Sequence, residues 1–228
     1  MEEEINTQMY TRGLGIFNPE KQRFNLKIFG VGSIGSFLTL NLAKLGFSDI
    51  TVFDFDKIEL HNISNQFYRI SDIGKLKTEA LKEVTKEFSD INLNIINEKI
   101  TPQNTSMLAE EININSILVL CFDTLKSRKL VYDALKGYPN ILLDLRMGGL
   151  EYSIQVVQLN DDKQCKAYEE SLKKKTKNLP CGMQSTLFVL LNIASEASKI
   201  VVAINNNENY PKILKRNMNS YLFINDLK

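Results

Sequence analysis

Short apolar runs alternate along this chain with longer stretches in which apolar side chains recur every three or four positions. Residues 26–29 form one such run, and residues 33–45 follow it with helical spacing. A short apolar run that ends in turn residues is typical of a buried strand, and the longer period is typical of a helix that packs on one face. Gly46 stands where such a helix needs a C-terminal cap. The pattern therefore predicts a strand, a turn and a helix in succession.

The same alternation continues along most of the chain. The expected strands are residues 26–29, 50–53, 93–96, 117–121, 141–143, 152–159 and 221–224. The expected helices are residues 33–45, 77–88, 103–111, 126–135 and 183–203, with a lysine-rich helix or crossover loop at 163–177. Because alternating strands and helices build parallel sheets, we predict an α/β fold: a Rossmann-like, doubly wound, mostly parallel sheet with a C-terminal antiparallel extension. Ligands of such sheets bind at the carboxyl ends of the strands.

The composition is that of an ordinary globular chain. Of the 228 residues, 43% are hydrophobic and 24% are charged, and 28 Lys and Arg residues balance 27 Asp and Glu residues to a net charge of +1. This balance gives no reason to expect a nucleic-acid or membrane partner. The acidic start at residues 1–4 is unlike a targeting peptide, so we expect no membrane-spanning segment and a cytoplasmic location.

The chain has few cysteine and histidine residues that could serve in catalysis or metal binding. The chain has three cysteines, Cys121, Cys165 and Cys181, and one histidine, His61. An odd number of cysteines without C-x-x-C spacing excludes a disulfide scaffold and argues against a closed zinc site. Every Ser-His or Cys-His catalytic pair would depend on His61, to which we assign no catalytic role.

A glycine motif lies between the first expected strand and the first expected helix. Gly30, Gly32 and Gly35 match G-x-G-x-x-G. In this motif the first glycine allows a tight turn, the second lets a phosphate approach the backbone, and the third allows the helix to pack closely on the strand. The helix N-terminus adds unpaired N–H donors and partial positive charge. The motif predicts a nucleotide site, and a tight turn without a ligand is the alternative.

Acidic and amide side chains follow the second expected strand. Asp54 and Asp56 come directly after it, and Asp54 lies 24 residues past Gly30. That offset is close to the value of about 20 at which a carboxylate reaches a ribose hydroxyl. These residues alone are equally compatible with a dehydrogenase. The next segment, residues 57–67, is rich in directed polar side chains such as Asn62 and argues against that interpretation.

Together these motifs resemble the ThiF/MoeB/HesA family, adenylating enzymes related to ubiquitin-activating enzymes. The positions that match the family pattern are Gly30, Gly32, Gly35, Asp54, Asp56, Asn62, Gln66, Gly74, Lys77, Asp123 and Arg128. The resemblance covers about residues 10–145 and, more faintly, residues 180–203. We expect a single adenylation domain over residues 1–228. The domain would consist of an N-terminal arm (1–25), a nucleotide-binding core (26–145) and a C-terminal extension (146–228).

The resemblance implies a reaction and a role for each matched residue. The C-terminal carboxylate of a small ubiquitin-like or sulfur-carrier protein, or of a peptide, would attack the α-phosphorus of Mg-ATP to give an acyl-adenylate and pyrophosphate. Asp54 would hold the ribose, Asn62 and Lys77 would contact phosphates, and Asp123 would bind Mg²⁺. The implied nucleotide-binding set also includes Gly30, Gly32, Gly35, Asp56 and Gln66. Arg12 resembles an N-terminal arginine that reaches the ATP of a partner subunit, so a homodimer is expected. Lys77, Asp123 and Arg12 are the implied catalytic residues.

Cys181 is a further candidate for catalysis. It precedes the expected helix at residues 183–203, and a thiol near a helix N-terminus can have a lowered pKa. In some members of the resembled family, a cysteine in this part of the chain carries the activated protein as a thioester or persulfide. A packed or exposed thiol without a catalytic role is the alternative.

The chain departs from the family pattern at Asn65, where relatives have arginine. The change removes a charge-assisted phosphate contact, for which Arg69 or Lys75 would have to compensate. Thr124 also replaces a common asparagine, and the four-cysteine zinc element of many relatives is absent. A non-catalytic scaffold that binds a ubiquitin-like partner is therefore the first alternative function. An NAD(P)- or FAD-dependent oxidoreductase is the second.

Overall fold

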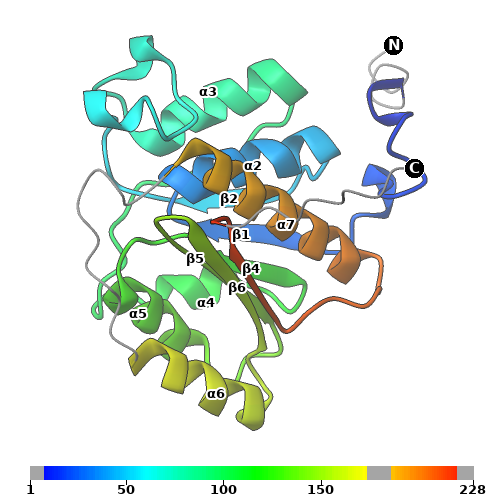
Figure 1. The fold of residues 1–228 in the computed structure, drawn as a ribbon, viewed down its shortest axis with the longest axis vertical. Coiled ribbons are helices and arrows are strands. Elements are labelled where there is room, and N and C mark those ends of the chain that lie inside the picture. The colour runs from blue at the N-terminus through cyan, green and yellow to red at the C-terminus, as the bar shows by residue number, and fades with distance from the viewer. Residues whose placement is uncertain (1–7, 174–185, 220–228) are drawn as a thin grey trace.

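The central feature of the fold is one seven-stranded sheet with helices on both faces (Figure 1). The computed structural model describes residues 8–173 and 186–219, and the strand order within them is β3-β2-β1-β4-β5-β6-β7. The strands are β1 (Asn25–Phe29), β2 (Ile50–Phe53), β3 (Asn94–Ile96), β4 (Ser116–Leu120), β5 (Ile141–Gly148), β6 (Glu151–Gln158) and β7 (Ile213–Asn217). Strands β1 to β5 are parallel, whereas β6 and β7 pair antiparallel. The predicted Rossmann-like, mostly parallel sheet with a C-terminal antiparallel extension is confirmed.

Each face of the sheet is covered by its own group of helices. The helices are α2 (Ser33–Leu45), α3 (Lys77–Ser89), α4 (Met107–Glu111), α5 (Leu125–Leu135), α6 (Asp162–Lys173) and α7 (Leu187–Asn205). Helices α2, α3 and α7 lie on one face, and α4, α5 and α6 lie on the other (Figure 1). Because both faces are covered, every residue of β1 and of β4 is buried. Short strands rich in apolar residues are typical of such sheets.

Helix α2 shows how the local sequence sets where a helix begins and ends. It begins at Ser33 and ends at Leu45, as predicted, and its C-cap Gly46 has a φ of +99°. This left-handed conformation lets the Gly46 N–H donate to the carbonyl of Ala43 at 3.0 Å. A Cβ atom on Gly46 would lie 2.4 Å from Cγ of Pro19, so only glycine fits there.

Several elements differ in their bounds from the predictions: α7 ends at Asn205 instead of residue 203, and β5 and α4 differ more. Strand β5 continues to Gly148 instead of ending at residue 143, because residues 145–148 pair with β6 beyond the end of β4. Helix α4 begins four residues later than expected. The Asn104 side chain accepts a hydrogen bond from the Thr101 N–H at 2.7 Å, which favours a turn over a helix at that point.

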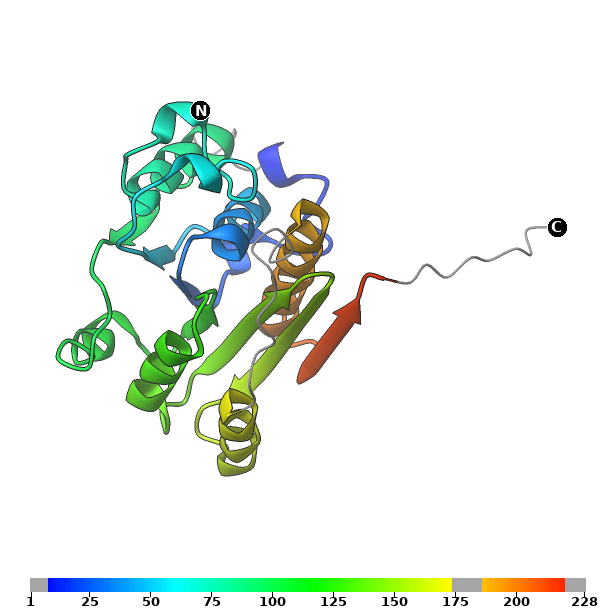
Figure 2. The same cartoon turned by 60° about the vertical axis from the view of Figure 1, so that its left-hand side comes forward.

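Strand β7 has no counterpart among the expected strands. It pairs with β6 at the outer edge of the sheet and is mostly exposed (Figure 2). Its sequence therefore shows neither a buried apolar run nor a clear alternation. The strand expected at residues 221–224 lies outside the described residues.

Helix α7 is long and apolar. By length and composition alone it could cross a membrane, since the mean hydropathy of its apolar window is 1.8. In the fold, 61% of the apolar window is buried. The helix packs against α2, β5 and β6, which is how a core helix of a globular protein buries its apolar surface.

Candidate nucleotide-binding site

The carboxyl ends of β1, β2 and β4 define the candidate site. Strand β1 lies between the other two, and Phe29 is in register with both Phe53 and Leu120. The residues that follow, including Gly30 and Asp54, therefore lie level at one edge of the sheet. The helices after β1 and β4 cover opposite faces, so the direction of the chain switches between these two strands. Doubly wound sheets bind ligands at such a switch point, and we call the region at these strand ends the crevice.

The glycine loop, residues 30–35, is closely packed on one side and open on the other. Gly30 has a φ of +90°, and its N–H donates to the carbonyl of Phe53 at 2.8 Å. A Cβ atom on Gly35 would lie 1.9 Å from the Gly30 carbonyl oxygen, so α2 packs directly on the turn. A Cβ atom on Gly32 would meet only Gln66 Nε2, at 3.9 Å, and the Gly32 N–H has no acceptor among the described residues. The open side thus offers N–H donors to an anion.

Asp54 is held against the glycine loop. Its Oδ2 accepts a hydrogen bond from the Val31 N–H at 2.8 Å, and its Oδ1 accepts one from the Asp56 N–H at 2.9 Å. Each oxygen keeps a lone pair for a further donor, such as a ribose hydroxyl. Burial raises the pKa of Asp54, and the Asp56 N–H and the Lys77 ammonium group oppose that rise. The carboxylate is therefore fixed where the predicted ribose contact requires it.

Lys77 joins the same cluster. Its Nζ lies 3.0 Å from Asp56 Oδ2, and its N–H donates to the Asp56 carbonyl at 2.9 Å. The Lys77 side chain is 9% exposed, whereas that of Asp56 is 52% exposed. A mostly buried ammonium group needs an anionic partner, and Asp56 supplies it here. The pair has no net charge, but it places an ammonium group beside the glycine loop and Asp54.

The loop after Asp56 brings two amide side chains to the same region. Asn62 is buried, and its Oδ1 accepts a hydrogen bond from the Glu59 N–H at 2.9 Å, which leaves its NH₂ group for another acceptor. Gln66 Nε2 lies beside Gly32, and Gln66 Oε1 is buried without a partner in the described part of the chain. Buried polar atoms are normally paired, so an orphaned amide oxygen beside a glycine loop fits a site that a ligand completes.

Asp123 is the exposed carboxylate of the site. It follows the end of β4 and forms no hydrogen bond or ion pair with any residue that the structure describes. Residues 8–173 and 186–219 contain no group of three or more His, Cys, Asp or Glu side chains that could hold a metal by themselves. Mg²⁺ is commonly bound by one or two carboxylates together with phosphate oxygens and water. Asp123 therefore fits a metal ion that arrives with a nucleotide.

Arg128 secures the strand end that carries Asp123. It is 4% exposed, forms an ion pair with Asp144, and donates to the carbonyl oxygens of Leu120 at 3.2 Å and of Leu145 at 2.7 Å. Its donors are thus occupied by the ends of β4 and β5. The structure gives this family-matched arginine the role of a brace, because both terminal nitrogens of its buried guanidinium are bonded to β4, β5 and the Phe122 carbonyl that follows β4.

Asp144 has two further partners, Arg146 on the same strand and Tyr168 on α6. Arg146 Nε donates to Asp144 Oδ2 at 2.8 Å, and the Tyr168 hydroxyl donates to the same oxygen at 2.9 Å. Arg146 also donates to the carbonyl of Ser171 at 3.1 Å, which ties α6 to the end of β5. Arg128 and Tyr168 have no sequence spacing that marks them as partners of Asp144, because they lie on α5 and α6 and meet it only in the folded chain.

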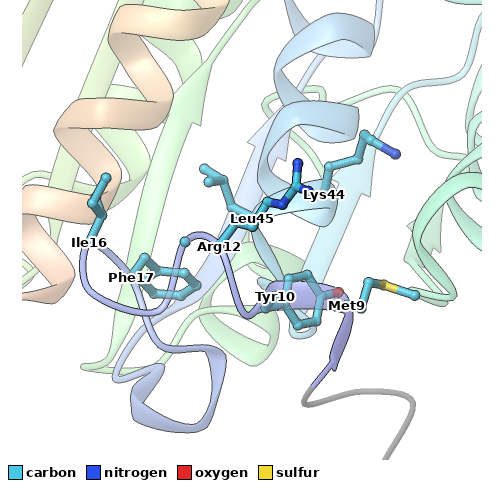
Figure 3. Close-up of a pocket in the computed structure, with 8 residues that line it drawn as sticks. Met9, Tyr10, Arg12, Ile16, Phe17, Lys44 and Leu45 are labelled. Carbon is cyan, nitrogen blue, oxygen red and sulfur yellow. The ribbon is translucent and has the colours of Figure 1, made fainter.

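Arg12 lies at the opposite end of α2 from the glycine loop. Together with Lys44 and Leu45 at the C-terminal end of that helix, it lines a pocket of about 180 Å³ (Figure 3). At 1.5 Å per residue, α2 separates Ser33 from Leu45 by about 18 Å. Arg12 is therefore too far away to contact a nucleotide at the glycine loop of its own chain. The other predicted nucleotide and metal residues in the described ranges gather at the carboxyl ends of β1, β2 and β4.

The structure describes two of the three cysteines, Cys121 and Cys165. Cys181, the predicted nucleophile, lies outside the described residues. Burial raises the pKa of Cys121 to about 12. Cys165 is 1% exposed, and its Sγ donates to the Leu159 carbonyl at 3.3 Å. Reactive cysteines are accessible and readily ionised, so Cys121 and Cys165 are structural.

The family model that matches this chain is that of the ThiF family, over residues 20–225. The chain belongs to the ThiF family. The match includes the glycine loop, Asp54, Lys77 and Asp123, so the resemblance expected from these motifs is confirmed for the family.

Known relatives match this ThiF-family chain over part of their length. The NEDD8-activating enzyme E1 catalytic subunit of Arabidopsis thaliana is 30% identical over 134 residues, which are 57% of this chain and 28% of the relative. The tRNA threonylcarbamoyladenosine dehydratase of Haemophilus influenzae is 34% identical over 101 residues, which are 41% of this chain and 39% of the relative. The aligned residues thus amount to well under half of either relative.

Solved structures share the fold of this ThiF-family chain. E. coli MccB, solved with AMPCPP and MccA, has a TM-score of 0.70 at 18% identity, and the match covers 93% of this chain and 72% of that one. E. coli tRNA N6-threonylcarbamoyladenosine dehydratase TcdA, solved with ATP, has a TM-score of 0.70 at 13% identity, over 88% of this chain and 95% of that one. At these identities the similarity shows the fold alone.

One expected compensation in this ThiF-family member is not supported. The family arginine that Asn65 replaces had two possible substitutes, but Arg69 forms ion pairs with Glu83 and Glu87, and Lys75 lies 2.7 Å from Glu83. These carboxylates belong to α3. Both cations therefore tie the loop to α3 instead of lining the phosphate side of the crevice.

Proposed function

We propose that this chain is an adenylyltransferase that uses Mg-ATP to activate the C-terminal carboxylate of a small ubiquitin-like or sulfur-carrier protein, or of a peptide. The observation that carries the proposal is the meeting, at adjacent strand ends, of the open glycine loop, the buried ammonium group of Lys77 and the exposed carboxylate of Asp123, which has no partner in residues 8–173 and 186–219. The relatives support it, since one is named an activating enzyme for NEDD8 and TcdA was solved with ATP.

The residues of the crevice suit a reaction between two anions. A bond forms between a carboxylate oxygen and the α-phosphorus, and the bond from that phosphorus to pyrophosphate breaks. Lys77 and the free N–H of Gly32 offset negative charge on the phosphates, which is what lets a carboxylate approach them. A magnesium ion bound at Asp123 supplies further positive charge to the phosphate oxygens.

The proposal includes a homodimer. Lys77 is paired with Asp56, and a magnesium ion offsets only part of the charge of a triphosphate, so a further cation at the phosphates would favour the reaction. Arg12 is exposed and lies beside the C-terminal end of α2, a helix whose length of about 18 Å separates that end from the glycine loop of the same chain. In a dimer this arginine completes the site of the partner subunit.

A non-catalytic scaffold that binds a ubiquitin-like partner is the second candidate. The observation that favours it is the loss of the family arginine at Asn65, with Arg69 and Lys75 both paired to carboxylates of α3. An NAD(P)- or FAD-dependent oxidoreductase has less support. Hydride transfer does not require a carboxylate such as that of Asp123 at the phosphate side of the crevice.

Exchange of labelled pyrophosphate into ATP separates these functions. With Mg-ATP and a ubiquitin-like protein that ends in Gly-Gly, we expect exchange that depends on the carboxylate and falls by at least about a hundredfold in Asp123→Asn. The control is Asp133→Asn, which changes another exposed carboxylate, one that pairs with Lys129 on α5. Mg-ATP binding without exchange would support the scaffold, and equal exchange by Asp123→Asn and wild type would refute the metal role of Asp123.

A further inference from the structure

Tyr68 holds the glycine loop from a distant part of the chain. Its hydroxyl donates to the Val31 carbonyl at 2.5 Å, across a separation of 37 residues. The Val31 N–H in turn donates to Asp54 Oδ2 at 2.8 Å. Val31 is fully buried, and both of its backbone polar groups are held by side chains of other segments. The loop is therefore fixed at the residue that precedes Gly32.

The contact with the Val31 oxygen also sets the direction of the Gly32 N–H. The two groups belong to one peptide unit, and the described residues contain no cis peptide bond. Because a trans peptide is planar, its C=O and N–H point to opposite sides. Tyr68 thus aims the Gly32 N–H away from itself. That N–H has no acceptor among the residues described, so it is available to a ligand.

The two residues before Tyr68 contact the same part of the molecule. The Phe67 N–H donates to Ser36 Oγ at 3.0 Å, and Gln66 Nε2 lies beside Gly32. Phe67 and Tyr68 therefore brace the first turn of α2 and the glycine loop. The brace made by Tyr68 depends on one hydroxyl group, which can be removed while the ring stays packed in the core.

The Tyr68 hydroxyl is a donor at neutral pH. The residue is 8% exposed. Burial, together with the nearby carboxylates of Asp54 and Asp72, raises the pKa of Tyr68 well above its usual value. The neutral phenol carries the proton that the Val31 oxygen accepts. The glycine loop is therefore held in one geometry by a hydrogen bond whose donor, the Tyr68 hydroxyl, stays protonated at neutral pH.

We infer that Tyr68 is a positioning residue for phosphate recognition: its hydroxyl orients the Val31–Gly32 peptide so that the Gly32 N–H faces a bound nucleotide phosphate. This inference rests on the proposed function, because it needs a nucleotide phosphate at the glycine loop. If the inference holds, removing the Tyr68 hydroxyl alone weakens nucleotide binding more than the loss of stability accounts for.

The first test compares Tyr68→Phe with Tyr132→Phe. Tyr132→Phe removes another hydroxyl, which donates to Glu169 Oε1 at 3.0 Å on the opposite face of the sheet. Mg-ATP affinity is measured by isothermal titration calorimetry, and thermal unfolding is measured alongside it. Tyr68→Phe is expected to weaken Mg-ATP binding about fivefold to tenfold, the factor that corresponds to one hydrogen bond of ordinary strength. Tyr132→Phe is expected to leave affinity within about twofold of wild type, with a comparable change in unfolding temperature.

The second test needs no nucleotide. In protein labelled with ¹⁵N-glycine, the Gly32 amide resonance of the free protein is expected to shift and to exchange faster with solvent in Tyr68→Phe, but not in Tyr132→Phe. Wild-type affinity for Mg-ATP in Tyr68→Phe, or an unchanged Gly32 resonance, overturns the inference. If wild type itself binds no Mg-ATP, the proposed function fails, and the Gly32 resonance still decides whether Tyr68 orients the loop.

Discussion

Gly35 is the position at which one added methyl group tests the packing of the glycine loop. A Cβ atom there would lie 1.9 Å from the Gly30 carbonyl oxygen, 2.9 Å from the Gly30 carbonyl carbon and 3.3 Å from Cys121 Cβ. Real Cβ atoms essentially never approach another heavy atom within 3.0 Å. In Gly35→Ala, α2 and the turn must therefore move apart by more than about 1 Å, and backbone on both sides of the contact has to shift.

The cost of this movement can be placed within known limits. Overpacking of a closed interior costs about 1–3 kcal/mol, and a clash between backbone atoms belongs at the upper end, about 3 kcal/mol. For a domain of this size, 1 kcal/mol lowers the unfolding temperature by about 2–4 °C. We therefore expect Gly35→Ala to unfold about 6–12 °C below wild type. The displaced loop is also expected to bind Mg-ATP poorly.

Gly32→Ala is the matched control, since it adds the same methyl group to the same loop. A Cβ atom on Gly32 meets only Gln66 Nε2, at 3.9 Å, which is an ordinary van der Waals contact. We expect a loss of stability below about 1 kcal/mol, but a weaker affinity for Mg-ATP, because the methyl group stands where a phosphate approaches the backbone. Differential scanning calorimetry and Mg-ATP titration on both variants separate the two effects. An unfolding temperature for Gly35→Ala within about 2 °C of wild type would refute the packing of α2 on the turn.

Three further predictions concern the rest of the site. Arg128→Met leaves the carboxylate of Asp144 buried without its main partner and is expected to cost about 3 kcal/mol in urea unfolding; stability equal to wild type would contradict the brace. Mixing Arg12→Ala with Asp123→Asn chains, each inactive alone, is expected to restore about a quarter of wild-type exchange activity through mixed dimers, whereas no recovery would contradict a partner role for Arg12. Because the pKa of Asp54 is raised, the folded protein binds its proton more readily than the unfolded chain does. The stability of wild type relative to Asp54→Asn is therefore expected to rise as pH falls from 7 to 4, and urea unfolding that showed it falling would contradict this assignment.

The parts of the fold that could be predicted from sequence are those set by local residues. Helix α2 has the predicted bounds because a glycine turn precedes it and Gly46 caps it. The glycine loop, Asp54 and Asp56 follow directly from the order of strand, turn and helix, since adjacent parallel strands end at the same edge of the sheet. Helical and strand periods are strongest where one chain segment meets a continuous core.

The parts that could not be predicted depend on pairing between distant segments. The length of β5 is set by its antiparallel partner β6, and β7 forms only because an edge of the sheet is open to it. Arg128 matches a family position, but its role as a brace is decided by Asp144, 16 residues further along. Tyr68 meets Val31 across 37 residues, with no spacing that would indicate the contact. Arg12 could be placed near α2 only once the fold of the N-terminal arm was known.

The central claim is that the carboxyl ends of β1, β2 and β4 hold a nucleotide and its metal ion. A crystal structure of the chain with magnesium and AMPCPP tests it most directly. The account predicts a phosphate oxygen at hydrogen-bond distance from the Gly32 N–H, a ribose hydroxyl on Asp54, and Mg²⁺ at about 2.1 Å from an Asp123 oxygen or from a water molecule that Asp123 holds. Phosphates bound away from the glycine loop, or crystals without nucleotide at saturating Mg-AMPCPP, would contradict it.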